Sequence, residues 1–271
     1  MLTRLIIAAA LSLTLAAPVS AQIAMPGDSG VAMGHIHLVV ADVERNRQLW
    51  IDVFDAKPLD REGLTGVKLP GMLVLFSKGT ASGPSQGSSV HHFGLQVRSR
   101  QEIVDAWRKA GLQVEREYIG SEGNPNAHLF TPDGADVEVM EVAGQQATAI
   151  AHHVHFAAAN DLAHRDWYVR LFSAAPRKRG DWHTADISGI NLSFRTPPEG
   201  TPSPPLATTG RAVDHVGFEV TDLEAFCRKL EQMGVRLDRP YARDAQLGVG
   251  TALLTDPAGT TIELTEGLRR Y

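Results

Sequence analysis

Histidine and glutamate residues recur at matching places in the two halves of this 271-residue chain. Imidazole and carboxylate groups are ligands for divalent metals such as iron, manganese and zinc, and imidazole also moves protons near neutral pH. The matching segments are residues 35–42 with 153–160, 92–97 with 215–220, and 132–138 with 257–263. This ordered series of matches indicates an internal duplication that repeats the same chemical groups.

The alternation of residue types places these groups on one face of strand-like segments. Successive side chains of a strand point to opposite faces, so apolar residues mark the face that packs in the core. In the first segment Ile36, Leu38 and Val40 form the apolar face, which leaves His35 and His37 on the other. The same argument places on the non-core face His92, Glu138, His153, His155, His215 and Glu263.

The elements that must position these residues follow one pattern four times. Each quarter opens with a strand-like alternation, continues with a helical pattern and ends with further short strands. The helical patterns span residues 43–54, 100–111, 161–172 and 222–234. Asp42 and Asp222 stand where helix N-caps are expected, and Gly111 and Gly234 stand where two of the helices should end.

A strand–helix–strands unit repeated four times resembles the βαβββ modules of the vicinal-oxygen-chelate superfamily. This superfamily includes glyoxalase I, extradiol dioxygenases and bleomycin- or fosfomycin-resistance proteins. The most specific marks are the opening segment His35–Asp42 and the closing segment Asp256–Leu264. The resemblance implies an α+β fold with four βαβββ modules paired into two lobes, at residues 22–144 and 150–271, whose non-core strand faces line cavities.

The same resemblance implies two metal sites, each with two imidazoles and one carboxylate. Such a ligand set leaves coordination positions open for substrate or water. The implied sites are His35 with His92 and Glu138, and His153 with His215 and Glu263. The expected cofactor is a divalent ion, with Fe²⁺, Mn²⁺ and Zn²⁺ all compatible with these ligands.

Three further histidines are candidates for catalysis. His128 stands ten residues before Glu138, where extradiol dioxygenases carry a tyrosine, and Leu253 holds the matching place in the second half. The first half is therefore expected to be the chemically equipped one. His37 and His155 lie one strand period beyond proposed ligands, so they could be additional ligands, hydrogen-bond donors to substrate or acid–base groups.

Two tyrosines and three other histidines, of which only the pair Tyr118 and Tyr241 recurs in the repeat, are expected to lie outside the chemistry. Tyr118 and Tyr241 are expected to pack at the edges of modules. His91, His152 and His164 are expected to face solvent or to lie in linkers.

The N-terminal segment has the features of a secretory signal peptide. Arg4 precedes an apolar stretch at residues 5–15, and Val19 and Ala21 put small residues at a cleavage site. We expect residues 1–21 to be removed and the product to be secreted, or periplasmic in a bacterium. The net charge of −5 and the lack of a basic run argue against nucleic acid or an anionic membrane surface as partners.

The sequence thus predicts an exported metalloprotein with a small-molecule substrate and no membrane attachment after cleavage. The leading interpretation is an enzyme that activates a small oxygenated organic substrate, with isomerase, lyase or dioxygenase chemistry. The alternative is a binding protein that sequesters a small metal-chelating compound unchanged. The lobes could pair within one chain or between chains, so a homodimer is possible.

Overall fold

The computed structural model describes residues 22–61 and 63–271, so the expected signal peptide lies outside the described residues. The elements in chain order are β1 (Val31–Val40), α1 (Val43–Phe54), β2 (Lys57–Arg61), β3 (Leu64–Leu69), β4 (Met72–Lys78), β5 (Val90–Val97), α2 (Arg100–Lys109), β6 (Val114–Ile119), β7 (Pro125–Phe130), β8 (Asp136–Glu141), β9 (Ala149–Ala157), α3 (Asp161–Phe172), β10 (Ala175–Arg179), β11 (Trp182–Ile187), β12 (Ile190–Arg195), β13 (Val213–Val220), α4 (Leu223–Gln232), β14 (Arg239–Arg243), β15 (Gly250–Thr255), β16 (Thr261–Glu266) and the 3-10 turn η1 (Leu268–Arg270). In the part of the chain that the structure describes, no helix has the length and apolar character needed to span a membrane.

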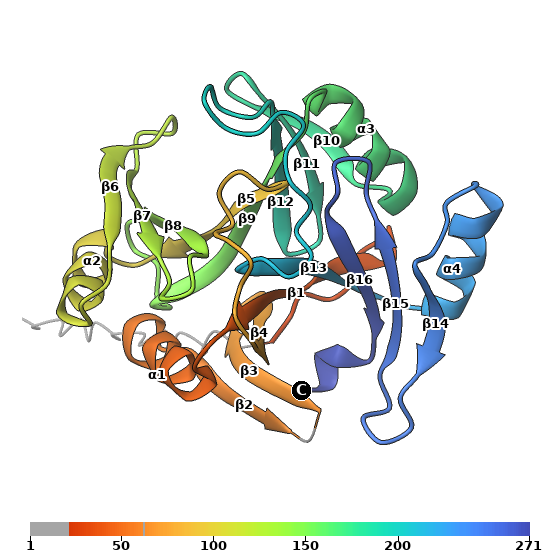
Figure 1. The fold of residues 1–271 in the computed structure, drawn as a ribbon, viewed down its shortest axis with the longest axis horizontal. Helices are drawn as coiled ribbons and strands as arrows, with labels where there is room; N and C mark the ends of the chain where they lie inside the picture. The colour runs from red at the N-terminus through yellow and green to blue at the C-terminus, as the bar shows by residue number, and fades with distance from the viewer. Residues whose placement is uncertain (1–21, 62) are drawn as a thin grey trace, which may run out of the picture.

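The strands form two eight-stranded sheets, each built from two βαβββ modules (Figure 1). One sheet has the order β14-β15-β16-β13-β1-β4-β3-β2, and the other has the order β10-β11-β12-β9-β5-β8-β7-β6. The α+β fold of four paired modules is therefore confirmed.

The pairing of the modules differs from the expectation. The first module pairs with the fourth through β1 and β13, and the second pairs with the third through β5 and β9. Each sheet thus joins modules from different halves, which corrects the expected pairing within residues 22–144 and within 150–271. The first strand of every module carries the same alternation, so periodicity alone does not say which of the others it joins.

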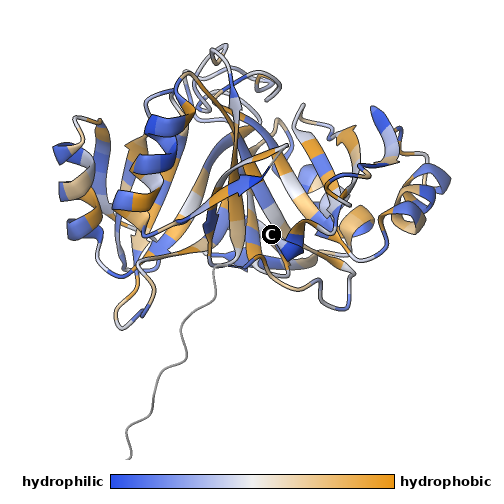
Figure 2. Ribbon diagram, turned by 90° about the horizontal axis from the view of Figure 1, so that it is seen from below, coloured by the Kyte–Doolittle hydropathy of each residue, from blue (hydrophilic) through white to orange (hydrophobic). Residues whose placement is uncertain are grey.

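The predicted core faces and helix ends agree with the structure. Ile36, Leu38 and Val40 are at most 1% exposed, within a core that both sheets share. The Asp42 side chain caps α1 by accepting the backbone N–H of Arg45, an interaction that stabilises a helix by about 1 kcal/mol. Gly111 follows α2 with φ +74°, the left-handed conformation that ends many helices. Figure 2 shows hydrophobic and hydrophilic residues alternating along the strands.

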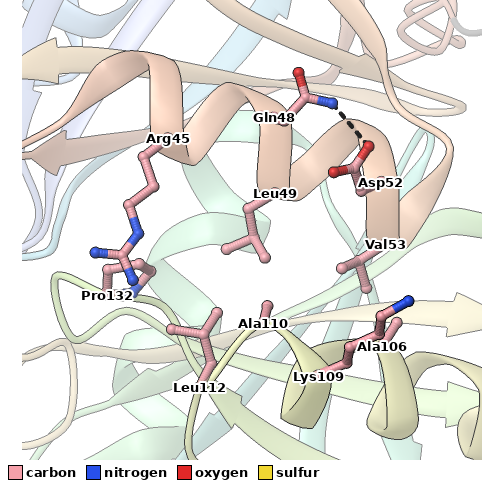
Figure 3. A pocket seen from close by; sticks show the side chains of 10 residues that line it. All are labelled: Arg45, Gln48, Leu49, Asp52, Val53, Ala106, Lys109, Ala110, Leu112 and Pro132. Carbon is pink, nitrogen blue, oxygen red and sulfur yellow. Dashed lines mark hydrogen bonds between the residues drawn. The ribbon is translucent and has the colours of Figure 1, made fainter.

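A groove of about 640 Å³ lies between α1 and α2 (Figure 3). Leu49, Val53 and Leu112 line it, and a hydrogen bond of 2.7 Å joins Gln48 to Asp52 at its rim. No histidine lines this groove. It is larger than the cavity described below, but it contains one carboxylate, Asp52, and no cluster of metal-binding side chains.

Candidate metal centres

The candidate metal-binding residues gather in two clusters, one on each sheet. We call the first the His92 site, formed by His92, Glu138, His153 and His155. We call the second the His35 site, formed by His35, His37, His215 and Glu263. Both are assembled within one chain. The expected sets of three are corrected, because the sheets pair β5 with β9 and β1 with β13.

The four residues of the His92 site are buried and their ligand atoms converge. Nε2 of His92 lies 3.1 Å and Nε2 of His153 lies 3.0 Å from the same Glu138 oxygen, Oε2. Nδ1 of His155 lies 2.8 Å from Nε2 of His92. The sequence left the role of His155 open, and the structure places it among the ligand-type residues. His35, which was expected beside His92 and Glu138, lies in the other cluster.

Gly94 creates the space for the His153 ring. It faces Glu138 on one side and His153 on the other, in the register of β8, β5 and β9. A Cβ atom at Gly94 would lie 2.0 Å from the His153 ring, and one at Gly217 would lie 2.0 Å from the ring of His35. Both sites therefore need a glycine two residues after a histidine.

The His35 site repeats this arrangement with slightly longer distances. Nε2 of His35 lies 3.3 Å and Nε2 of His215 lies 3.5 Å from Oε2 of Glu263. The His37 ring stacks on His215 with 4.4 Å between centroids, and its Nε2 is 2.7 Å from the Ser77 hydroxyl. His153, which was expected here, belongs to the His92 site.

The chemistry of the donor atoms fits a divalent metal. Nε2 of His153 and of His155 are buried without a hydrogen-bond partner, as are both ring nitrogens of His35. Nε2 of His153 is close to Glu138 but off the direction of a hydrogen bond. Nε2 of His153 and Nε2 of His35 each lie near a carboxylate without a hydrogen bond, and a metal would satisfy such unpartnered lone pairs.

The protonation states of His92 and Glu138 also suit metal binding, whereas that of His215 suits it less. Burial lowers the pKa of His92 to about 3, so its imidazole is neutral near pH 7. Burial raises the pKa of Glu138, but contacts with His153 and His92 outweigh it and hold that pKa well below its usual range. In the His35 site burial lowers the pKa of His215, but Asp214 outweighs it, with help from the site's own glutamate, so the net shift is upward. Neutral imidazole and ionised carboxylate are the forms that bind metals.

A second layer of polar groups orients the His92 site. Nδ1 of His91 contacts Nδ1 of His92 at 2.9 Å, and Nδ1 of His152 contacts Nδ1 of the neighbouring His153 at 2.8 Å. His91 is buried, so the expectation that it and His152 face solvent or lie in linkers is wrong. Partners of this kind fix the ring orientation of metal-binding histidines, and the doubled histidines were a visible sequence signal.

Tyr118 and Asn126 hold the other oxygen of Glu138. Asn126 Nδ2 donates to Oε1 at 2.6 Å, and the Tyr118 hydroxyl also donates to Oε1. The expectation that Tyr118 only packs at a module edge is therefore wrong. Burial, and then the charge of Glu138, raise the pKa of Tyr118, so its hydroxyl keeps its proton.

His128 lies beside this group and is held by a buried carboxylate. Its Nδ1 is 2.9 Å from Oδ1 of Asp136, and both side chains are almost fully buried. Burial raises the pKa of Asp136, but the hydrogen bond with His128 and the charges of the neighbouring histidines together outweigh it, so the pKa is lowered. An ionised carboxylate only accepts hydrogen bonds, which places the proton on Nδ1 and leaves Nε2 as the acceptor. Nε2 lies 3.2 Å from the Tyr118 hydroxyl.

A cavity of about 320 Å³ opens onto these residues. Its lining includes His92, Glu138, His128 and Tyr118, together with Trp182 from β11 of the third module. The cavity thus joins ligand-type residues to a histidine–aspartate pair.

The family model for the Glyoxalase/Bleomycin resistance protein/Dioxygenase superfamily matches residues 32–139 and 150–264. The chain belongs to this superfamily. Glyoxalase I from Zea mays has a similar structure, with a TM-score of 0.65 and 15% identity over 87% of this chain and 92% of that chain. A candidate dioxygenase from Bacillus subtilis gives a TM-score of 0.62 and 13% identity over 90% of this chain and 86% of that chain. At these identities the likeness shows the fold alone. A comparison with functionally characterised proteins gave no match.

Apolar residues lie beside the His35 site in this member of the superfamily, while His37, His215 and Glu263 stay partly exposed. Leu73 and Leu75 of β4 pair in register with His35 and His37, so they share the same sheet face. These leucines belong to a buried cluster that we call the apolar plug, formed by Ile23, Leu59, Leu73, Leu75, Val249 and Leu268. The plug lies on the sheet face that carries His35 and His37. The corresponding face of the other sheet lines the cavity described above.

The C-terminal turn contributes to the plug and is anchored by a buried carboxylate. Glu219 of β13 accepts the backbone N–H of Gly267 at 2.8 Å and that of Arg269 at 3.3 Å. It also accepts the Thr265 hydroxyl at 2.7 Å. The Tyr271 hydroxyl donates to the backbone carbonyl of Leu247 at 2.7 Å. These bonds hold η1 against the His35 side of the sheet.

His164 lies in neither site. It is buried, and its Nε2 is 2.6 Å from Oδ2 of Asp256, which also accepts the Tyr168 hydroxyl at 2.9 Å. The expectation that His164 faces solvent or lies in a linker is wrong. Asn46 and Asp133 make the matching contact in the first half, at 3.0 Å, so these pairs tie a helix to a turn of the neighbouring module.

Proposed function

We propose that this protein is a metal-dependent enzyme that acts on a small oxygenated organic molecule at the His92 site. The observation that carries the proposal is the junction of four buried ligand-type residues with a cavity that His128, held by Asp136, also lines. The His35 site has the same ligand types, but Leu253 stands where the His92 site has His128. We therefore assign the chemistry to the His92 site and a structural role to the His35 site.

The residues of the His92 site would hold the metal through His92, Glu138 and His153, with His155 as a fourth candidate ligand. A divalent ion in this place would polarise substrate oxygens and stabilise developing negative charge. Fe²⁺, Mn²⁺ and Zn²⁺ all suit imidazole and carboxylate ligands.

His128 is proposed to move the proton. Asp136 holds its Nδ1, so the lone pair of Nε2, which accepts from Arg116 at 3.2 Å, is the one that would take a proton of the substrate once Arg116 turns to the ligand. Asp136 also stabilises the imidazolium that forms when Nε2 accepts that proton. Tyr118 and Asn126 keep Glu138 in place throughout. Proton removal from a bound oxygenated substrate is a step that isomerase, lyase and dioxygenase reactions can share.

The test combines metal content with turnover. Protein prepared without added metal would be analysed by mass spectrometry, then assayed against catechols, hemithioacetals and α-hydroxy ketones. We expect bound metal, turnover of at least one class, and loss of turnover without loss of metal in His128→Ala. Bound metal with every ligand recovered unchanged would instead support the sequestering protein. No metal bound or taken up would overturn the proposal.

Export is proposed separately, on the sequence of residues 1–21. The expected mature N-terminus is Gln22. N-terminal sequencing of the protein from a bacterial periplasmic fraction would check this, and an unprocessed Met1 terminus would contradict it.

A further inference from the structure

The cavity of the His92 site carries three arginines from different strands. Arg116 lies in β6, and Arg179 and Arg195 are the last residues of β10 and β12. Arg116 comes from the second module and the other two come from the third. The cavity therefore acquires this charge only because those two modules share a sheet.

Aromatic rings hold two of these guanidinium groups in place. The Trp182 ring stacks on His155 with 4.4 Å between centroids and 12° between planes, and Cζ of Arg195 lies 5.4 Å from the Trp182 centroid. On the other side Cζ of Arg116 lies 4.7 Å from the centroid of Tyr118. Stacking fixes the plane of a guanidinium and leaves the N–H groups at its edge for a ligand.

Two of these arginines, Arg116 and Arg195, form no ion pair among the described residues, whereas Arg179 lies 3.9 Å from Glu122. Arg116 contacts Nε2 of His128 at 3.2 Å, and within residues 22–61 and 63–271 neither Arg116 nor Arg195 has a carboxylate at ion-pair distance. Nε of Arg195 is buried without a hydrogen-bond partner. Burial, and next the charge of Arg116, lower the pKa of Arg195. Two guanidinium groups that share a cavity and form no ion pair keep their N–H groups available for an anionic ligand.

The His35 site lacks stacked arginines of this kind, so the repeated fold does not require them. Arg239 stands at the place of Arg116, but it donates to Glu263 at 2.9 Å. Ser77 stands at the place of Arg195 and Leu64 at that of Trp182. The stacked, unpaired arginines therefore belong to the open site alone.

We propose that the His92 cavity binds an anionic substrate, a small oxygenated molecule with a carboxylate-type group held by Arg116 and Arg195. This inference rests on the proposed function, since the oxygens of the same molecule would face the metal-binding residues. A cavity of about 320 Å³ is at the small end of ligand sites. Guanidinium groups bind carboxylates through charge-assisted, often bidentate hydrogen bonds.

The test compares two probes that differ by one carboxylate. Catechol and 3,4-dihydroxybenzoate offer the same pair of adjacent oxygens, and only the second is an anion at neutral pH. Isothermal titration of the Zn²⁺-loaded protein would give both dissociation constants, with the metal content of every sample measured in parallel. We expect the benzoate to bind at least about tenfold more tightly, and less so as salt is raised.

Variants separate the arginines from general effects. Arg195→Gln and Arg116→Gln are each expected to remove most of the preference for the anion while leaving the affinity for catechol unchanged. Arg239→Gln, the matched change beside the His35 site, should keep the preference. Using two different arginine variants protects the test against a folding defect in either one.

The outcomes distinguish this inference from the proposed function. Three outcomes would overturn the proposal of an anionic substrate. These are equal affinities for the two probes, a preference that survives both arginine variants, and no binding of either probe to metal-loaded protein. In those cases retained metal would leave the metalloenzyme proposal standing. A protein that holds no metal would contradict both the metalloenzyme proposal and the proposal of an anionic substrate.

Discussion

The His92 and His35 sites are built from equivalent rows of residues that cross the two sheets. In one sheet the paired positions run Arg116, His128, Glu138, Gly94 and His153. In the other they run Arg239, Leu253, Glu263, Gly217 and His35. The rows differ in kind at one place, where leucine replaces histidine. Duplication has therefore kept the ligand-type residues and changed the residue paired with the glutamate, which is His128 in one sheet and Leu253 in the other.

The surroundings differ more than the rows. Met140 lines the open cavity, whereas its counterpart Thr265 hydrogen-bonds to Glu219. Glu219 anchors the C-terminal turn, and Gln96 stands at its place in the first half. The two sites thus differ at positions two and four residues along the strands from the ligand-type residues.

Replacing His128 with leucine makes the two rows alike and should have the largest effect. We expect turnover to fall by about 10²–10⁴-fold, the usual contribution of a general acid–base group, with metal content unchanged. Steady-state kinetics and mass spectrometry on the same samples would measure both. Leu253→His, the reciprocal change, should leave turnover as it was, because Thr261 stands where Asp136 holds the His128 ring in the other sheet. Unchanged turnover in His128→Leu would contradict the role given to this residue.

Opening the plug should weaken the fold. Leu268 is 1% exposed, and truncating a buried leucine to alanine lowers the free energy of unfolding by about 2–5 kcal/mol. Leu268→Ala should also let a chelator reach the His35 site faster. Urea denaturation and chelator kinetics would report the two effects, with the exposed Leu206→Ala as control. An unchanged rate of metal release would show that the plug does not limit access.

The two glycines allow each site to be perturbed alone. Gly94→Ala places a methyl group against the His153 ring, so the metal affinity of the His92 site should fall by about 10–100-fold, as for other changes that displace a metal ligand. Gly217→Ala should do the same at the His35 site only. Competition with a chelator of known affinity would measure each. Equal losses at both sites in either variant would argue against independent centres.

The smallest effect concerns acid stability. The buried Asp256 has a lowered pKa because its hydrogen bonds with His164 and Thr260 outweigh the effect of burial. It therefore adds stability that is present above the unfolded pKa of about 4 and is lost as pH falls through the lower folded value. Asp256→Asn should cost about 1–3 kcal/mol at pH 7, with a smaller loss at pH 3. Denaturation at both pH values checks this, and an equal loss at both would contradict it.

Much of the local structure follows from the sequence because it depends on neighbouring residues. The expected bounds of α1 and α3 are those found, since apolar periodicity and the caps Asp42 and Asn160 define them locally. The eight residues on the non-core strand faces were identified for the same reason. Alternation fixes a face without any knowledge of the partner strand.

The assembly of those residues could not be predicted in the same way. His92 meets His153 because β5 pairs with β9, and the alternation in β5 would suit another first strand equally well. Tyr118 reaches Glu138 across β7 from a mostly exposed strand, so no apolar pattern marks it. Arg195 lies beside the site only through the same pairing. Long-range register decides each of these contacts, and a periodic pattern carries little information about it.

Metal stoichiometry in single-ligand variants tests the central claim, a metal centre shared between the second and third modules. Native mass spectrometry would count the ions in the wild type, His153→Ala and His35→Ala. We expect His153→Ala to lose the ion on which turnover depends, although His153 is in the other half of the sequence from His92 and Glu138. His35→Ala should keep that ion and its turnover. Loss of turnover and metal in His35→Ala, with both retained in His153→Ala, would contradict the account.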